Sequence, residues 1–254
     1  MNTVKVRNLE IGTGKPKIIV PIVGVTKEEI IAEAKSFDSI PADAAEWRVD
    51  WFEHAFEFTE VEKVLRELRE ILQNMPLLVT FRTKNEGGEK SMEPDAYAEL
   101  NLKAAQTGFV DLIDVEIFTG DGIVRKMIDG IHAAGVKVVA SNHDFQKTPA
   151  KSEIIKRLCK MQDMGADISK IAVMPQSKRD VLTLLAATEE MVTEYADRPV
   201  ITMSMAQTGI ISRLCGEVFG SSMTFGAAKK ASAPGQMGVE DLSVVLNLLH
   251  SAME

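Results

Sequence analysis

Two residues are conspicuous candidates for catalysis. They are a lysine inside one apolar segment and a histidine at the end of another. Lys170 lies within the apolar run 168–174, and a lysine on a buried strand face is costly unless its amine is neutral or paired. A neutral amine attacks ketones to form Schiff bases, and desolvation with neighbouring cations supplies it. His143 titrates near neutral pH, which suits general acid–base catalysis. The ordinary alternatives are a lysine whose amine reaches solvent and a histidine that caps a loop.

Charged residues at other predicted strand ends extend this set. Arg48, Arg82 and Arg213 carry guanidinium groups that match a carboxylate bidentately. Near Lys170, such cations would also disfavour the ammonium form of the amine. Glu46 would then hold Arg48 or accept a substrate hydroxyl. Taken singly, these arginines are equally typical of surface salt bridges, so only a shared location would make them a carboxylate clamp.

Glu86 and the methionine pair Met203 and Met205 have weaker individual signals. Glu86 precedes a Gly-Gly turn, and its carboxylate would orient His143 and fix its tautomer. The methionines either fill the core or make adaptable contact with a reacting ring. Ser232, near glycines that follow the last predicted strand, gives a weak indication of a phosphate site without any phosphate-loop spacing.

A metal site is the competing interpretation of the acidic residues. Glu46, Asp50, Glu86 and His143 offer the oxygen and nitrogen ligands of a carboxylate–imidazole site. The arginines and the lysine expected at the same place oppose a divalent cation. We therefore expect no metal.

Composition limits the classes of protein that the chain can belong to. Its 254 residues are 45% hydrophobic and 26% charged, with a net charge of −8, which is ordinary for a globular protein. An acidic chain argues against a nucleic-acid or membrane-surface binder. No apolar run approaches a membrane span, residues 1–17 lack the apolar core of a signal peptide, and Cys159 and Cys215 have no metal-site spacing. These features favour a cytoplasmic protein.

The elements that must position these side chains alternate regularly. Short β-branched runs are each followed by a turn and an amphipathic stretch, and several runs are continuously apolar, as in parallel strands buried on both faces. We predict strands over residues 17–22, 44–49, 77–81, 112–116, 136–141, 168–173, 200–204 and 223–225.

Helix starts and ends are marked between these strands. Thr26 with Glu29 and Thr59 with Glu62 have the spacing of capping boxes. Thr148 precedes a proline, as a capping residue often does. Glycines at 108, 135 and 165 stand where helices should end.

Eight strands alternating with helices favour a (β/α)8 TIM barrel over a doubly wound sheet. We expect residues 1–254 to form one catalytic domain, with a small hairpin of residues 4–6 and 9–11 closing the barrel bottom. In such barrels catalytic groups sit at the carboxyl ends of the strands. The charged residues named above all fall at these predicted ends.

These motifs, taken in order, resemble type I 3-dehydroquinate dehydratases. The similarity is carried by Glu46-Trp-Arg48-Val-Asp50, Phe81-Arg82-Thr with Glu86-Gly-Gly, and His143-Asp144-Phe145. It continues through Lys170-Ile-Ala-Val-Met-Pro175, Met203-Ser-Met205, Ser212-Arg213-Leu214 and Ser232-Ala-Pro-Gly-Gln236. Each motif is weak alone, but the collinear set runs from about residue 17 to the C-terminal helix.

The resemblance implies a hydro-lyase of the shikimate pathway that converts 3-dehydroquinate to 3-dehydroshikimate. It implies that Lys170 forms the imine, that His143 shuttles protons and that Glu86 partners His143. It further implies substrate contacts from Glu46, Arg48, Arg82, Arg213, Ser232 and Gln236. Members of the family are homodimers that use no metal or organic cofactor.

Some expectations remain open at this point. Pro21 stands where some family members have a serine, which puts a substrate contact there in doubt. The small-residue segment 231–237 is our candidate for a loop that closes over the substrate. A class I aldolase-type barrel shares the lysine and is the alternative enzyme, whereas a non-catalytic barrel that binds a hydroxycarboxylate would have lost Lys170 or His143.

Overall fold

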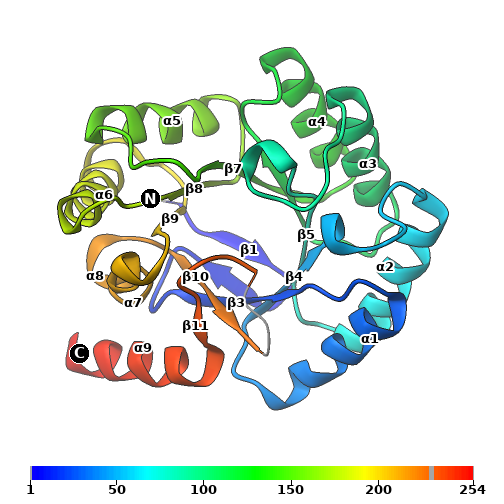
Figure 1. Ribbon diagram of the computed structural model, residues 1–254, viewed down its shortest axis with the longest axis horizontal. Coiled ribbons are helices and arrows are strands. Elements are labelled where there is room, and N and C mark those ends of the chain that lie inside the picture. Colours follow the sequence, from blue (N-terminus) through cyan, green and yellow to red (C-terminus); the bar gives the residue numbers. More distant parts are fainter. Residues whose placement is uncertain (1, 229–231, 254) are drawn as a thin grey trace.

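The computed structural model describes residues 2–228 and 232–253, and their parallel strands curl into a barrel surrounded by helices (Figure 1). The barrel strands are β3 (Lys17–Ile22), β4 (Ala44–Arg48), β5 (Leu77–Thr80), β6 (Leu112–Glu116), β7 (Lys137–Asp144), β8 (Ile168–Val173), β9 (Val200–Ser204) and β10 (Met223–Ala227). A two-residue strand, β11 (Met237–Gly238), pairs with β10. The sheet order, β11-β10-β3-β4-β5-β6-β7-β8-β9, confirms the predicted (β/α)8 architecture.

The helices lie between successive strands and form the outer layer (Figure 1). They are α1 (Lys27–Lys35), α2 (Phe58–Leu72), α3 (Pro94–Gln106), α4 (Asp121–Ala133), α5 (Lys151–Asp163), α6 (Lys178–Glu190), α7 (Ile211–Leu214), α8 (Gly216–Phe219) and α9 (Val239–Met253). Short 3-10 turns are η1 (Ser36–Ser39), η2 (Val49–Trp51), η3 (Lys84–Glu86) and η5 (Gln207–Gly209), and η4 (Met191–Tyr195) is a π-helical turn. No helix in the described ranges has the length and apolarity needed to cross a membrane.

Two apolar layers explain why the strands are continuously hydrophobic. Side chains alternate between the two faces of a strand. In β8, Ile171 and Val173 pack outward with the helices, whereas Ile168 and Ala172 join the inner cluster. Lys170 stands between these last two and therefore points into the barrel.

The predicted helix signals were partly right. Thr26 caps α1, and its side chain accepts a hydrogen bond from the backbone N–H of Glu29. Thr59 was wrongly predicted as a cap, because α2 begins at Phe58 and its N-cap is Glu57, two residues before the predicted one. Thr148 was also misplaced, since Ala150 precedes α5. The glycines at 108, 135 and 165 all have positive φ angles, as expected of helix ends.

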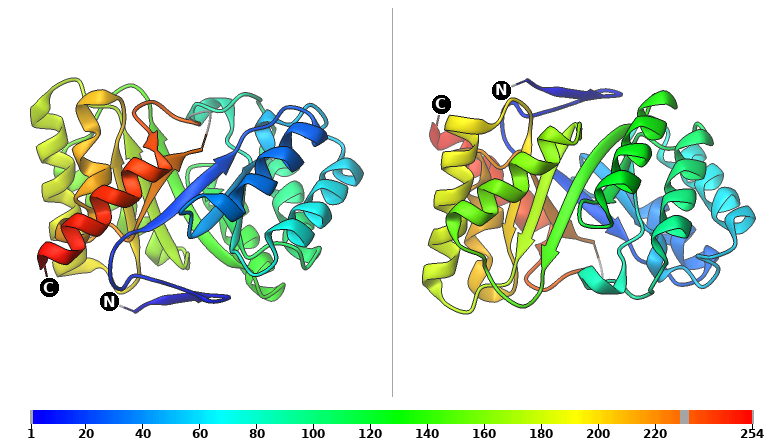
Figure 2. Two further views of the ribbon diagram at one scale, coloured as in Figure 1. Left: turned by 90° about the horizontal axis from the view of Figure 1, so that it is seen from below. Right: turned by 90° about the horizontal axis from the view of Figure 1, so that it is seen from above.

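The N-terminal hairpin lies across one end of the barrel (Figure 2). Its strands, β1 (Val4–Val6) and β2 (Leu9–Ile11), pair antiparallel. Val4, Val6 and Ile11 are buried in the same cluster as the innermost residues of the barrel strands. The hairpin therefore closes the bottom as predicted, and the site must open at the other end.

Candidate active site

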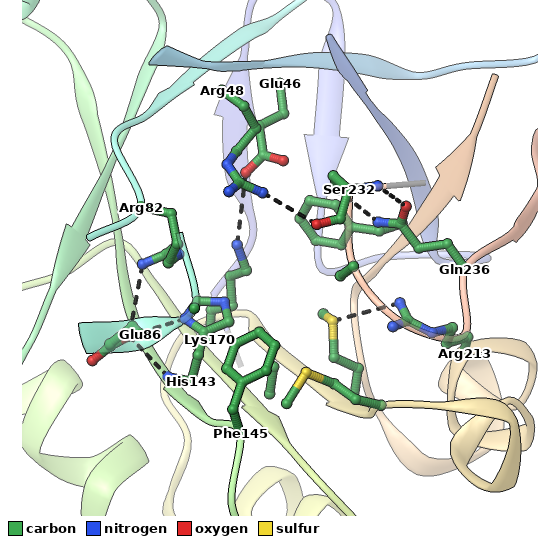
Figure 3. A pocket seen from close by; sticks show the side chains of 16 residues that line it. Glu46, Arg48, Arg82, Glu86, His143, Phe145, Lys170, Arg213, Ser232 and Gln236 are labelled. Carbon is green, nitrogen blue, oxygen red and sulfur yellow. Dashed lines mark hydrogen bonds and ion pairs between the residues drawn. The ribbon is translucent and has the colours of Figure 1, made fainter. Parts of the chain in front are cut away.

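A cavity lies at the carboxyl ends of the strands, and every predicted site residue lines it (Figure 3). The cavity therefore brings together side chains from elements spread over most of the chain. The predicted residues are Glu46, Arg48, Arg82, Glu86, His143, Lys170, Met203, Met205, Arg213, Ser232 and Gln236, and Gly87, Phe145, Ala172, Phe225 and Ala233 complete the lining.

Lys170 is held by carboxylates and an aromatic ring. Only 3% of the residue is exposed. Its Nζ lies 3.2 Å from Asp114 Oδ2 and 3.9 Å from Glu46 Oε1, and 4.6 Å from the centroid of the Phe225 ring. The nearest charges to the amine are therefore acids on the inward positions of β4 and β6, and Arg82 lies beyond Asp114, at 2.8 Å from its Oδ1.

His143 and Glu86 form a hydrogen-bonded pair at the wall of the cavity. Glu86 Oε2 lies 3.0 Å from His143 Nδ1 and accepts the backbone N–H of the same residue at 2.9 Å. The side-chain amide of Asn142 donates to Glu86 Oε1 at 3.0 Å. These bonds fix the carboxylate and leave His143 Nε2 as the other ring nitrogen available for chemistry.

Burial shifts this pair in opposite directions. Desolvation raises the pKa of Glu86 to about 8, although the nearby Arg82 opposes it. Desolvation, followed by the charges of Arg82, Lys170 and Arg48, holds the pKa of His143 well below its ordinary value. The imidazole is therefore neutral near pH 7 and is able to accept a proton.

Arg82 is the centre of a buried ionic network. Its guanidinium lies 2.8 Å from both Asp114 Oδ1 and Glu116 Oε1, and 3.7 Å from Glu86 Oε2. Burial lowers the pKa of Arg82, but these carboxylates more than compensate and hold it well above the usual value. Arg82 is thus a fixed cation.

Arg48 is held differently from our expectation. Asp50, not Glu46, binds it through two bonds, from Nε to Oδ1 at 2.8 Å and from Nη2 to Oδ2 at 2.7 Å. Glu46 instead accepts the hydroxyl of Thr80 at 2.9 Å. Glu46 therefore keeps a free oxygen toward the cavity, which suits the alternative role of accepting a substrate hydroxyl.

Arg213 is a buried cation without an acidic partner among the described residues. It is 1% exposed, and its side chain donates to the carbonyl of Pro234 at 3.2 Å and to the sulfur of Met203 at 3.6 Å. Its Nε has no hydrogen-bond partner within the part of the chain that the structure describes. Desolvation lowers the pKa of Arg213 to about 10. A buried, unpaired guanidinium that lines a cavity is suited to hold an anion.

The segment after β10 forms another wall of the cavity. Gln236 Nε2 donates to Ser232 Oγ at 3.0 Å, and the backbone N–H of Ser232 donates to Gln236 Oε1 at 2.8 Å. Arg48 reaches the carbonyl of Ser232 at 3.5 Å. The predicted closing loop, 231–237, falls partly outside the described residues, because residue 231 is not among them.

Sequence reasoning missed the acids of β6. Asp114 and Glu116 are buried and face the same side of a strand, two positions apart. The signal was available, because charged residues in an apolar run are as conspicuous there as Lys170 is in β8. In the described part of the chain, no three histidine, cysteine or acidic side chains are grouped so as to hold a metal ion.

Comparison with known proteins matches the chain to the family model described as type I 3-dehydroquinase, over residues 18–253. It is 56% identical over 250 residues to a 3-dehydroquinate dehydratase of Clostridioides difficile strain 630, which covers 98% of each chain. It is 54% identical over 252 residues to the enzyme of the same name from Salmonella typhimurium strain LT2, covering 99% of this chain and 100% of the relative.

Solved structures agree with these matches. The crystal structure of a type I 3-dehydroquinate dehydratase from Clostridium difficile, with covalently modified comenic acid, superposes with a TM-score of 0.97 at 55% identity and covers 99% of both chains. A 3-dehydroquinate dehydratase of Geobacillus kaustophilus HTA426 superposes with a TM-score of 0.96 at 35% identity, covering 100% of this chain and 98% of the other.

Proposed function

Because the chain belongs to the type I 3-dehydroquinase family, we propose that it dehydrates 3-dehydroquinate to 3-dehydroshikimate through an imine on Lys170. The family assignment makes it a lyase and the reaction a step of the shikimate pathway. The aldolase-type alternative has no support from these matches.

The observation that carries the mechanism is the shared location of three buried groups. Lys170 offers an amine, His143 offers a neutral imidazole fixed by Glu86, and Arg213 offers a cation with no acidic partner in the described chain. All three line one cavity. A substrate with a ketone and a carboxylate satisfies both the amine and the unpaired guanidinium.

Imine formation is the first step. The amine of Lys170 attacks the C3 ketone, and the carbinolamine loses water to give a protonated imine. Starting from the ammonium, the balance is ammonium plus ketone to iminium plus water, so the nitrogen carries one positive charge before and after. The iminium withdraws electrons and makes the proton at the adjacent C2 more acidic.

His143 then carries out the elimination. Its neutral ring removes the C2 proton, and the electrons of the C–H bond form the enamine. The enamine expels the C1 hydroxyl, which leaves as water when protonated His143 returns the proton. Hydrolysis of the product imine consumes a water and frees Lys170. One histidine serves both steps because the proton and the hydroxyl leave from the same face.

The remaining residues hold the substrate. Arg213 binds the C1 carboxylate and so places C2 near His143, and such positioning contributes several kcal/mol to the lowering of the barrier. The substrate hydroxyls are bound by Glu46, Arg48, Arg82, Ser232 and Gln236, while Met203 and Met205 contact the ring. The chemistry requires no metal or organic cofactor, since the iminium itself is the electron sink.

Borohydride reduction with 3-dehydroquinate, followed by intact mass measurement, tests this proposal. The wild type should gain one reduced adduct on Lys170, and Lys170→Ala should gain none. His143→Ala should still form the adduct, while kcat falls by about 10²- to 10⁴-fold for loss of general acid–base catalysis. An adduct that survives Lys170→Ala, or near-normal turnover by His143→Ala, would remove the residue from its role.

We also propose that residues 1–254 form a single domain and that two copies associate as a homodimer in the cytoplasm. The continuous nine-stranded sheet supports one cooperative unit. Exposed apolar side chains on α6, α8 and α9, namely Leu182, Val218, Val244 and Leu248, offer surface for association. Light scattering on a sizing column should give twice the mass of the chain.

A further inference from the structure

Asp114 is the acid that lies nearest to the reacting nitrogen. It is fully buried on β6, and its Oδ2 lies 3.2 Å from Lys170 Nζ. Its other oxygen, Oδ1, accepts the hydroxyl of Ser141 at 2.6 Å and lies 2.8 Å from an Arg82 nitrogen. One oxygen is thus anchored, and the other is directed at the amine.

Anchoring Arg82 does not account for this carboxylate. Glu116 already pairs with Arg82 at 2.8 Å, and it also accepts the backbone N–H and the hydroxyl of Thr83 at 2.8 and 2.6 Å. Glu116 has no contact with Lys170. Of the two acids of β6, Glu116 therefore anchors Arg82 and Thr83, and Asp114 is the one that contacts the amine of Lys170.

We propose that Asp114 is the counterion of the imine nitrogen, which keeps the imine protonated throughout the dehydration. The proposal rests on the imine-forming role of Lys170. An imine withdraws electrons effectively only when its nitrogen is protonated, because only then does the enamine form without a negative charge on nitrogen. A fixed anion within hydrogen-bond distance of that nitrogen favours the protonated form.

The charge balance of the reaction permits such a fixed anion. Lys170 carries one positive charge as the ammonium and again as the iminium, so the carboxylate need not gain or lose a proton. Burial raises the pKa of Asp114, but the charges of Arg82 and Lys170 and the hydrogen bond from Ser141 outweigh it and hold the pKa below the usual value. Asp114 therefore stays ionised and acts electrostatically, while His143 moves the protons.

Other charged groups surround the contact between Asp114 and Lys170, and one of them, Glu116, supplies the control variant. Glu46 on β4 faces the same nitrogen at 3.9 Å, too far for a hydrogen bond. Arg82 and Glu86 face Asp114 from neighbouring elements, and Glu116 lies two positions away on β6 itself. Tyr97 of α3 donates its hydroxyl to the backbone carbonyl of Asp114 at 3.2 Å. His143 on β7 also interacts with the charge of Lys170.

Asp114→Asn and Glu116→Gln form a matched pair. Each removes one carboxylate from Arg82 and keeps the side-chain shape, but only Asp114→Asn removes the counterion. With 3-dehydroquinate, Asp114→Asn should still give the borohydride adduct on Lys170. Its kcat near pH 7.5 should fall about a hundredfold, the loss typical of one electrostatic group at a charged centre, and the pH optimum should move to lower pH because the imine then loses its proton more readily. Glu116→Gln should lower kcat without moving the optimum.

The outcomes separate the two levels of the proposal. The counterion role of Asp114 is overturned, and the imine mechanism is kept, if the wild type forms the adduct but Asp114→Asn has the wild-type pH optimum. The same conclusion follows if Glu116→Gln shifts the pH optimum as much as Asp114→Asn does. No adduct in the wild type overturns the imine mechanism and the counterion with it. If Asp114→Asn is unfolded by circular dichroism, Raman spectra of the wild-type imine decide instead. Its C=N band should shift in D₂O at pH 7.5, and a deuterium-insensitive band would overturn the counterion.

Discussion

Three buried cationic residues of the site differ in how their positive charge is compensated. Lys170 has an acid within hydrogen-bond distance, Arg82 has two at 2.8 Å, and Arg213 has no acidic partner in the described chain. A desolvated cation without a partner destabilises the empty protein. The substrate carboxylate would neutralise the charge of Arg213, so of these three residues Arg213 should contribute most to substrate binding.

Arg213→Lys tests this by keeping the charge and removing the planar, bidentate donor. We expect KM for 3-dehydroquinate to rise and kcat/KM to fall by roughly 10- to 100-fold, as for the loss of hydrogen bonds to a charged group. Steady-state kinetics measure it. Arg179→Lys, at an exposed position on α6, is the control and should leave both constants unchanged. An unaltered KM in Arg213→Lys would mean that another group binds the carboxylate.

The His143–Glu86 pair sets the pH dependence of the free enzyme. The ring of His143 is already neutral near pH 7, so the group that titrates in this range is Glu86, whose pKa is about 8 and whose carboxyl must be ionised to accept the Nδ1–H of His143. We expect kcat/KM to rise about tenfold per pH unit as that proton is lost and to level off above pH 8. In Glu86→Gln the rise should lie at lower pH, because the pKa of His143 is depressed by burial and by Arg82. An identical profile in both proteins would exclude Glu86 from the titration.

Helix capping at the element scale depends on backbone geometry as well as on residue type. Thr26 and Thr59 have the same spacing to a glutamate, yet only Thr26 has the extended backbone of an N-cap and accepts the N–H of Glu29. Thr59 lies inside the first turn of α2, after the N-cap Glu57, so its hydroxyl is not at the capping position.

This difference predicts unequal effects of the same mutation. Thr26→Ala should lower the free energy of unfolding by about 1 kcal/mol, the usual value of an N-cap side chain. Thr59→Ala should change it by less than about 0.5 kcal/mol, as exposed substitutions do. Urea unfolding followed by circular dichroism measures both. Equal destabilisation would show that the hydroxyl of Thr26 contributes nothing as a cap.

In the whole molecule, the apolar packing of the hairpin and the charged residues of the active site lie at opposite ends of the barrel. The hairpin β1–β2 lies across one end of the barrel (Figure 2). It buries Val4, Val6 and Ile11 there, while the charged cavity lies at the carboxyl ends of the strands. Between β9 and β10 the ring is closed by an isolated bridge from Val200 to Ser221. The Ser221 hydroxyl supports it by accepting the backbone N–H of Thr202 at 3.0 Å.

Ile11→Ala should therefore weaken folding and spare catalysis. Ile11 is fully buried, and its truncation should cost about 2–5 kcal/mol of unfolding free energy. The value of kcat at 25 °C should stay within twofold of wild type, because the change lies at the opposite end of the barrel from the site. Val25→Ala, at a position 42% exposed and outside the proposed association surface, serves as the control for unfolding and should have little effect. A large fall in kcat for folded Ile11→Ala would refute this separation.

The sequence by itself determined the order of strands and helices and the residues at the carboxyl ends of the strands. Periodicity is a local property, so six of the eight barrel strands and both hairpin strands begin and end where predicted or within one residue. Because parallel strands in a barrel present these ends at one face, the predicted site residues also share one cavity.

Only the tertiary structure decided which charges pair. The acids of the site lie on or just after barrel strands, as Asp114, Asp50 and Glu46 do. Which group each acid pairs with depends on strand register and on how far the side chains extend. The sequence placed arginines at the same rim as Lys170, and only the fold shows that Asp114 is the charged group nearest to its amine. Electrostatic energy depends on distances of a few ångströms in a desolvated interior, and those distances arise only when strands from different parts of the chain close into a barrel.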